Sequence, residues 1–166
     1  THLHSDGTDA EILAMYNPGT HSNHWKEKLA SFNNSDIADM FMSHEMIDKA
    51  ELFPNMDGPA VFKTAVVKFP EVIMEALATN GYQPADLTML IPHQANLRIA
   101  QFVQQKLKLR DDQVYNNIQK YGNTTAASVP IALCEAWEQG KIKEGDLVCL
   151  AAFGSGFTWA SALLKW

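Results

Sequence analysis

Short apolar runs alternate with helical segments in the second half of the chain, and this alternation constrains the fold more than any other feature. Residues 87–91 and 147–153 are apolar runs with the length of buried strands, and residues 97–108 have apolar side chains at helical spacing. The Gly-Ser-Gly turn at 154–156 predicts that another strand, 157–164, returns beside 147–153. Strands that alternate with helices predict an α/β fold in which helices flank a mixed sheet.

The chain divides into three parts on the same criteria. Residues 1–19 are expected to hold a short strand over 11–15 and a turn, and residues 20–56 an insertion with one or two short helices. Residues 57–166 form the main unit, which carries the alternating pattern.

Three further elements are expected within the main unit. A helix runs from Pro59 to Asn80-Gly81, with a kink or break caused by Pro70. A short strand is expected over 114–116. The helix that ends at Gly140 is expected to be capped by Thr124 or Thr125.

Composition and charge exclude several classes of protein. With 166 residues, of which 46% are apolar and 19% charged, the chain is long enough to bury a core and is not disordered. A net charge of −6 argues against broad nucleic-acid binding, and no apolar run approaches the roughly 20 residues of a membrane span. Two cysteines make no disulfide framework, so a cytoplasmic protein is expected. The first residues contain neither an initiator Met nor a signal peptide, so we expect the sequence to begin within a longer protein.

Three positions at strand ends or turns are candidates for chemistry. His93 follows a buried strand, where ligands bind in open α/β sheets, although a histidine there can equally cap the next helix. Asn123 lies in a polar turn, either as a turn former or as an N–H donor to a developing oxyanion. The 154–156 turn either supplies backbone N–H groups to an oxyanion or only reverses the chain. Because its spacing is not G-x-S-x-G, a serine hydrolase is not favoured.

The other polar candidates favour structural roles. Two closely spaced pairs of histidines are His2 with His4 and His21 with His24. A Pro-Gly turn separates the pairs and no cysteine is near, so no metal site is expected. Cys134 and Cys149 have apolar neighbours and no adjacent base, so both are expected to be buried, unreactive thiols. A local basic set, which fits either an anionic partner or a solvated face, comprises Lys63, Arg98, Lys106, Lys108 and Arg110.

Three motifs, taken together, carry a resemblance to a known family. They are Ile91-Pro92-His93-Gln94-Ala95-Asn96-Leu97-Arg98-Ile99, then Tyr121-Gly122-Asn123-Thr124 followed by Ala126-Ala127-Ser128-Val129-Pro130, and Phe153-Gly154-Ser155-Gly156-Phe157-Thr158-Trp159. In order and separation they resemble the C-terminal half of a type III β-ketoacyl-acyl carrier protein synthase. The resemblance covers residues 57–166 well and residues 1–7 recognisably, whereas 20–55 is longer than in common bacterial members.

This resemblance implies the thiolase fold, in which two α/β halves, each with a five-stranded mixed sheet, form a layered α-β-α-β-α sandwich. It implies a decarboxylating Claisen condensation of an acyl-CoA, often acetyl-CoA, with malonyl-acyl carrier protein at the start of fatty acid synthesis, without a cofactor. The implied partners are the N-terminal half of the synthase, the acyl carrier protein and a coenzyme A thioester, and the whole enzyme is implied to be a homodimer. A polyketide or quinolone-type acyltransferase of the same fold, or a non-catalytic protein that binds the carrier protein, remains an alternative.

The resemblance also assigns roles to residues. His93 and Asn123 match the histidine and asparagine of a Cys-His-Asn triad, whose N–H donors stabilise the enolate left by loss of carbon dioxide. The resemblance implies that the histidine acts as a donor through its Nε nitrogen. The oxyanion and malonyl pocket is assigned to Phe153, Gly154 and Ser155, the substrate tunnel to Gly58, Phe62, Ala95 and Asn96, and carrier-protein docking to Lys63, Arg98 and Lys106. Many members have glycine in place of Ser155, and serine is compatible with a backbone donor if its dihedrals are not glycine-only. The nucleophilic cysteine of the family matches neither Cys134 nor Cys149, so the chain alone is expected to be inactive.

Overall fold

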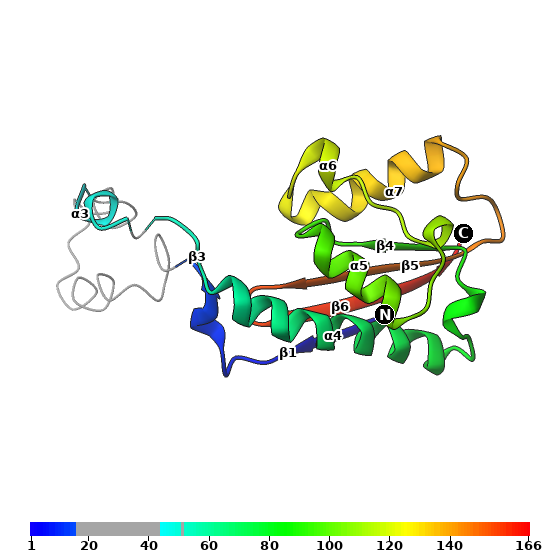
Figure 1. Cartoon of the computed structure of the whole chain (residues 1–166), viewed down its shortest axis with the longest axis horizontal. Coiled ribbons are helices and arrows are strands. Elements are labelled where there is room, and N and C mark those ends of the chain that lie inside the picture. The colour runs from blue at the N-terminus through cyan, green and yellow to red at the C-terminus, as the bar shows by residue number, and fades with distance from the viewer. Residues whose placement is uncertain (16–43, 51) are drawn as a thin grey trace, which may run out of the picture.

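The computed structural model describes residues 1–15, 44–50 and 52–166 of the chain, and Figure 1 shows its elements. The strands are β1 (His2–Ser5), β2 (Leu13–Ala14), β3 (Asn55–Met56), β4 (Met89–Pro92), β5 (Leu147–Gly154) and β6 (Thr158–Lys165). The α-helices are α3 (His44–Asp48), α4 (Gly58–Thr79), α5 (Leu97–Lys106), α6 (Ile118–Tyr121) and α7 (Ser128–Glu138). Single 3-10 turns lie at Ala10–Ile12, Pro84–Asp86, Asp111–Gln113 and Thr125–Ala127. The expected α/β class is confirmed.

Four of these strands form one mixed sheet in the order β1, β6, β5, β4. β5 and β6 form an antiparallel hairpin in which Gly154 is opposite Thr158, and β4 is parallel to β5. β1 pairs antiparallel with β6, so segments from both ends of the sequence lie side by side (Figure 1). The hairpin predicted from the Gly-Ser-Gly turn is therefore confirmed.

The strand expected over residues 114–116 is reduced to a single parallel bridge between Leu90 and Val114. Tyr115 N still donates to Leu90 O at 3.0 Å, but the backbone N–H groups two and three residues later donate to the Gln94 side chain. Because a side chain binds these amides, the chain turns away from the sheet. The described part of the sheet thus has four strands, with this bridge where the expected fifth strand would lie.

The alternation of side chains along β5 gives the sheet two apolar faces. Cys149, Ala151 and Phe153 contribute to a core built with α4 and α5, whereas Val148 and Leu150 contribute to a second core built with α7. The pair α4 and α5 therefore covers one face of the sheet and α7 covers the other, which produces an α-β-α layering (Figure 1).

Helix α4 begins and ends near the predicted positions. Asp57 caps its first turn, where the Oδ1 atom accepts a hydrogen bond from Ala60 N at 3.0 Å, and Asn80 follows its last residue. Of the expected kink or break at Pro70, the break does not occur, since α4 is continuous over 22 residues through Pro70. Pro70 and Phe69 are both buried, and this packing offsets the roughly 3 kcal/mol that an internal proline costs. Neither α4 nor any other helix among the described residues is apolar enough, over a sufficient length, to cross a membrane.

Two local predictions are wrong for physical reasons. Of the strand expected over residues 11–15 only β2 forms, because the 3-10 turn Ala10–Ile12 precedes it. Neither Thr124 nor Thr125 caps the start of α7 through its side chain. Asn123 accepts the available hydrogen bond instead, from Thr125 N. Most of the insertion expected over 20–56 lies outside the described residues; its described part contributes α3 and β3, and β3 pairs with β2.

Candidate active site

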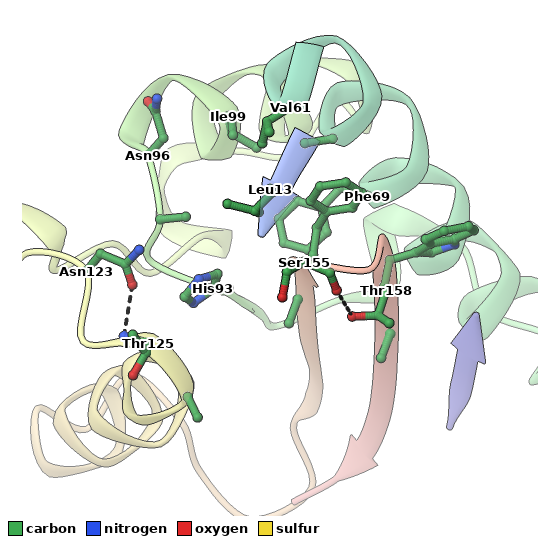
Figure 2. A pocket seen from close by; sticks show the side chains of 18 of the residues that line it. Leu13, Val61, Phe69, His93, Asn96, Ile99, Asn123, Thr125, Ser155 and Thr158 are labelled. Atoms are coloured by element: carbon green, nitrogen blue, oxygen red, sulfur yellow. Dashed lines mark hydrogen bonds between the residues drawn. The ribbon is translucent and has the colours of Figure 1, made fainter. Parts of the chain in front are cut away.

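A cavity of about 880 Å³ lies at the end of the sheet where β4 and β5 terminate, and Figure 2 shows the side chains around it. The carboxyl ends of parallel strands are the usual ligand-binding edge of an open α/β sheet. The wall includes nine residues that the sequence singled out: His93, Asn123, Phe153, Gly154, Ser155, Gly58, Phe62, Ala95 and Asn96. Three motifs that are separate in the sequence therefore meet at one cavity.

His93 directly follows β4, and its backbone N–H donates to Ala151 O of β5 at 2.8 Å. This bond fixes the residue at the carboxyl ends of two parallel strands. Partial burial lowers the pKa of the imidazole below its usual 6.5, so the ring is neutral at neutral pH. Its Nδ1 atom lies 2.5 Å from Ser128 Oγ at the start of α7. The other ring nitrogen, Nε2, is left available to the cavity.

The side-chain amide of Asn123 is held in one orientation by its own turn. Its Oδ1 atom accepts a hydrogen bond from Thr125 N at 2.9 Å. The amide nitrogen is therefore directed away from this contact, and Figure 2 shows it beside His93 at the cavity. Thr125 has a φ of 51°, which is unfavourable for a β-branched residue by about 1–3 kcal/mol. The turn retains this strained backbone, and with it the amide orientation that presents two N–H groups to the cavity.

The loop after β5 forms a third side of the cavity. Phe153 is buried, and its ring centroid lies 5.0 Å from that of Phe157 and 6.5 Å from that of Trp159. Ser155 does not have a positive φ, so its backbone conformation does not require glycine and a serine fits there. The next residue, Gly156, has a φ of 132°, and a Cβ atom there would lie 2.8 Å from Thr158 Cγ2, so glycine is required at that position.

The remaining predicted residues divide into two groups. Asn96 lines the cavity and also caps α5, since its Oδ1 accepts a hydrogen bond from Arg98 N at 2.9 Å. Lys63, Arg98 and Lys106 are exposed on α4 and α5, two helices that contact each other, and they do not line the cavity.

Known proteins resemble this chain in sequence and in fold. The profile of the family 3-Oxoacyl-[acyl-carrier-protein (ACP)] synthase III C terminal matches residues 77–166, which is more than half of the chain. The chain belongs to this family. The β-ketoacyl-[acyl-carrier-protein] synthase III of Campylobacter jejuni serotype O:6 is 41% identical over 167 residues, covering 98% of this chain and 50% of the relative.

Two further relatives agree. The corresponding synthase of Caldanaerobacter subterraneus is 50% identical over 124 residues, which cover 75% of this chain and 38% of that protein. The solved structure of the synthase III from Thermus thermophilus matches with a TM-score of 0.77 at 36% identity, covering 99% of this chain and 44% of that one. The chain thus has the fold of the C-terminal half of a type III synthase, the thiolase fold, and spans at most about half the length of these relatives.

Gln94 was not among the residues that the sequence singled out, but it connects two of the segments that carry them. Its side chain is only 3% exposed, and Oε1 accepts hydrogen bonds from Asn117 N at 3.0 Å and from the next backbone N–H at 3.1 Å. Its Nε2 donates to Pro92 O at 2.7 Å. Gln94 therefore joins the loop that carries His93 to the segment that leads to Asn123. Its position as the second residue after the buried strand β4 was the only sequence signal for this role.

Glu135 of α7 holds the same segment from the other side. Asn117 Nδ2 donates to its Oε2 at 2.8 Å, and Lys120 Nζ lies 2.5 Å from its Oε1. The hydrogen bond from Lys120, together with that from Asn117, lowers the pKa of Glu135 to about 2. The carboxylate is therefore ionised across the physiological range and anchors α6 to α7.

Of the two cysteines that were expected to be buried, one is buried and the other is exposed. Cys149 is buried, and burial raises the pKa of its thiol to about 12, as expected for an unreactive cysteine. Cys134 is exposed rather than buried because its side chain projects from α7 toward Glu138, whose charge raises the thiol pKa. Neither cysteine lines the cavity.

The N-terminal histidines contact the side chain of Glu75 on α4. His2 Nδ1 and His4 Nε2 lie 3.3 Å and 2.6 Å from the two Glu75 carboxylate oxygens. Among residues 1–15, 44–50 and 52–166, no group of three His, Cys, Asp or Glu side chains is arranged to hold a metal ion. His21 and His24 lie outside the described residues.

The lowered pKa of His93 predicts a specific dependence of stability on pH. Below about pH 6.5 the unfolded chain binds a proton at His93 that the folded chain binds only at lower pH, so the free energy of unfolding falls as the pH falls. Denaturant unfolding at about pH 7.5 and about pH 5.5 should show a larger loss of stability for the wild type than for His93→Gln. Equal losses in the two proteins would contradict a neutral, partly buried imidazole.

Proposed function

We propose that this chain is the catalytic C-terminal half of a β-ketoacyl-acyl carrier protein synthase III. It would condense an acyl-CoA, in the first instance acetyl-CoA, with malonyl-acyl carrier protein to start fatty acid synthesis. The observation that carries the proposal is that His93 and Asn123 line the same cavity, and that Asn123 Oδ1 accepts a hydrogen bond from Thr125 N. This arrangement leaves N–H donors for a substrate oxygen, as an enolate-forming reaction requires.

The decarboxylation step uses these donors. The bond between the malonyl carboxylate and Cα breaks, carbon dioxide leaves, and the electron pair passes into an enolate whose negative charge lies on the thioester oxygen. N–H groups of His93 and Asn123 stabilise this charge as it develops, which lowers the barrier because the interaction is stronger in the transition state than in the substrate. The buried ring of Phe153 disfavours the charged carboxylate over neutral carbon dioxide.

The condensation step requires a group from outside this chain. The enolate carbon attacks the carbonyl of an acyl group held as a thioester on a cysteine of the N-terminal half. A carbon–carbon bond forms, the carbon–sulfur bond breaks, and the cysteine leaves as a thiolate. Backbone N–H groups of the loop over Gly154 and Ser155 are placed at the cavity to stabilise the tetrahedral intermediate. No cofactor takes part, since both acyl groups are already activated as thioesters.

The surface of the chain supports the proposed partners. Trp137 of α7 and the neighbouring Tyr121 are 55% and 43% exposed, on the face of the sheet that an N-terminal half of the same fold would cover. Lys63, Arg98 and Lys106 supply positive charge for the acidic carrier protein, and the whole enzyme would form a homodimer. Two free thiols fit a reducing compartment, which supports a cytoplasmic location.

Turnover by the assembled protein tests the function. The chain should be combined with its N-terminal half and supplied with acetyl-CoA and malonyl-acyl carrier protein carrying a labelled carboxyl carbon. Release of labelled carbon dioxide together with a ketoacyl-carrier protein product is expected from the assembled halves, and no release from this chain alone. A matched control replaces the nucleophilic cysteine of the N-terminal half by alanine, which should abolish product.

Three other outcomes would contradict the proposal. Carrier-protein binding without turnover in the assembled halves indicates a binding module. Turnover only with an acyl donor other than acetyl-CoA indicates an acyltransferase of the polyketide or quinolone type. Equal turnover by this chain alone would show that it does not depend on a second half.

A further inference from the structure

Ser128 lies between two elements of the active-site wall and contacts both. It is the first residue of α7, its side chain is only 2% exposed, and its Oγ lies 2.5 Å from His93 Nδ1. The same Oγ accepts a hydrogen bond from Gln94 N at 3.2 Å. One buried hydroxyl thus contacts both the imidazole and the backbone directly after it.

The direction of the Ser128–His93 hydrogen bond follows from counting protons. A backbone N–H can only donate, so Ser128 Oγ accepts from Gln94. If Nδ1 also carried a proton, the hydroxyl would accept twice, and its own proton would need another acceptor in a buried site. Leaving a buried donor without an acceptor costs about 1–3 kcal/mol. If Ser128 instead donates to an unprotonated Nδ1, every group has a partner.

We infer that Ser128 is a positioning residue that fixes the tautomer of His93, with the proton on Nε2 and Nε2–H directed to the cavity. The neutral imidazole has one N–H, and a proton on Nδ1 would leave Nε2 only as an acceptor. An acceptor cannot stabilise a negative oxygen. Ser128 therefore determines whether His93 serves the reaction as a donor. This inference deepens the proposed function and rests on it for its catalytic consequence, but not for the tautomer itself.

The experiment measures the tautomer and the activity separately in the assembled synthase. Histidine labelled with nitrogen-15 is incorporated, and the His93 resonances are assigned from their absence in a His93→Gln variant. In the wild type, Nε2 is expected to be the protonated nitrogen and Nδ1 the unprotonated one. Ser128→Ala is expected to shift the population toward protonated Nδ1, and to lower the rate of malonyl decarboxylation about tenfold. This loss is smaller than the roughly 10²- to 10³-fold effect of removing an oxyanion donor outright.

Two variants control for a structural role. Ser161 is also a buried serine, and its Oγ donates to Val72 O at 2.8 Å away from the cavity, so Ser161→Ala removes a comparable hydroxyl without altering the tautomer. Ser128→Thr retains the hydroxyl and should recover the wild-type tautomer and most of the rate. A Ser128 variant that fails to fold is identified by its thermal unfolding, and the tautomer of the wild type remains a test that needs no Ser128 variant.

The outcomes separate this inference from the proposed function. Protonated Nδ1 in the wild type, or an unchanged tautomer in folded Ser128→Ala, would overturn the role of Ser128 even if the synthase is active. The expected tautomer and its loss in Ser128→Ala support that role even if the assembled halves prove to lack decarboxylase activity, in which case the proposed function fails by itself.

Discussion

Replacing His93 by alanine is expected to slow the decarboxylation of malonyl-acyl carrier protein by the assembled synthase about 10²- to 10³-fold. Under the proposed function the variant removes one of two side-chain donors to the enolate oxygen, while the backbone bond from residue 93 to Ala151 O is retained. The decrease should be seen in kcat as well as in kcat/KM, since the donor acts on charge that develops only in the transition state. Release of labelled carbon dioxide measures the rate.

Asn123→Asp is the matched companion variant. A carboxylate keeps the oxygen that accepts from Thr125 N, and so keeps the turn, but it replaces the amide N–H groups by a negative oxygen. A loss at least as large as that of His93→Ala is expected. The double variant should lose much less than the product of the two single losses, because the donors act on the same oxygen. Single variants within about threefold of the wild type would contradict the shared role, given the 10²- to 10³-fold reference effect.

Gln94→Met is expected to lower the free energy of unfolding by about 3 kcal/mol and to reduce activity strongly at temperatures where the protein is still folded. Methionine fills a similar volume, but it leaves two backbone N–H groups and the Pro92 carbonyl without the partners that Gln94 provides. The loop of His93 and the segment before Asn123 would then no longer be joined. Thermal or denaturant unfolding measures the stability, and carbon dioxide release measures the activity.

Gln113→Met separates stability from site geometry. Gln113 is also a buried glutamine, whose Nε2 donates to Leu87 O at 2.5 Å and whose Oε1 accepts from Arg110 N at 3.0 Å. Neither glutamine lines the cavity, but only Gln94 joins the loop of His93 to the segment before Asn123. The variant should lose about 2 kcal/mol of stability and retain activity when assayed well below its unfolding temperature. If both variants lose activity in proportion to their stability, Gln94 has no specific role at the site.

Much of the site could be predicted because its residues occur in short continuous motifs. His93 and Asn123 each stand beside a strand end or turn, and nine predicted positions do line the cavity. Their neighbours Gln94 and Ser128 were inside the same motifs, yet no pattern assigned them a role. Their role depends on hydrogen bonds between residues 23 to 35 positions apart, and such partners cannot be counted along the chain.

The expectations for residues 114–116, Pro70 and Cys134 differ from the structure for a common physical reason. Residues 114–116 have strand propensity, but the Gln94 side chain binds the amides that would have continued the ladder beside β4. Pro70 predicts a kink or a break, and the break is absent because the core around Phe69 keeps α4 continuous. Cys134 has apolar neighbours in sequence, but it projects from the side of α7 that does not face the sheet. In each case tertiary contacts outweigh a local preference of a few kcal/mol or less.

The sequence by itself predicted the alternation of strands and helices in the second half of the chain and the position of the hairpin, because apolar periodicity and turn chemistry act over a few neighbouring residues. The roles expected for His93 and Asn123 came instead from the resemblance of their motifs to a known family. Only the tertiary structure decided that the three motifs share one cavity, that Thr125 N donates a hydrogen bond to Asn123 Oδ1, and that Ser128 is the partner of His93 Nδ1. These facts depend on which groups become buried together, and a buried polar group must find its partner wherever the fold places one.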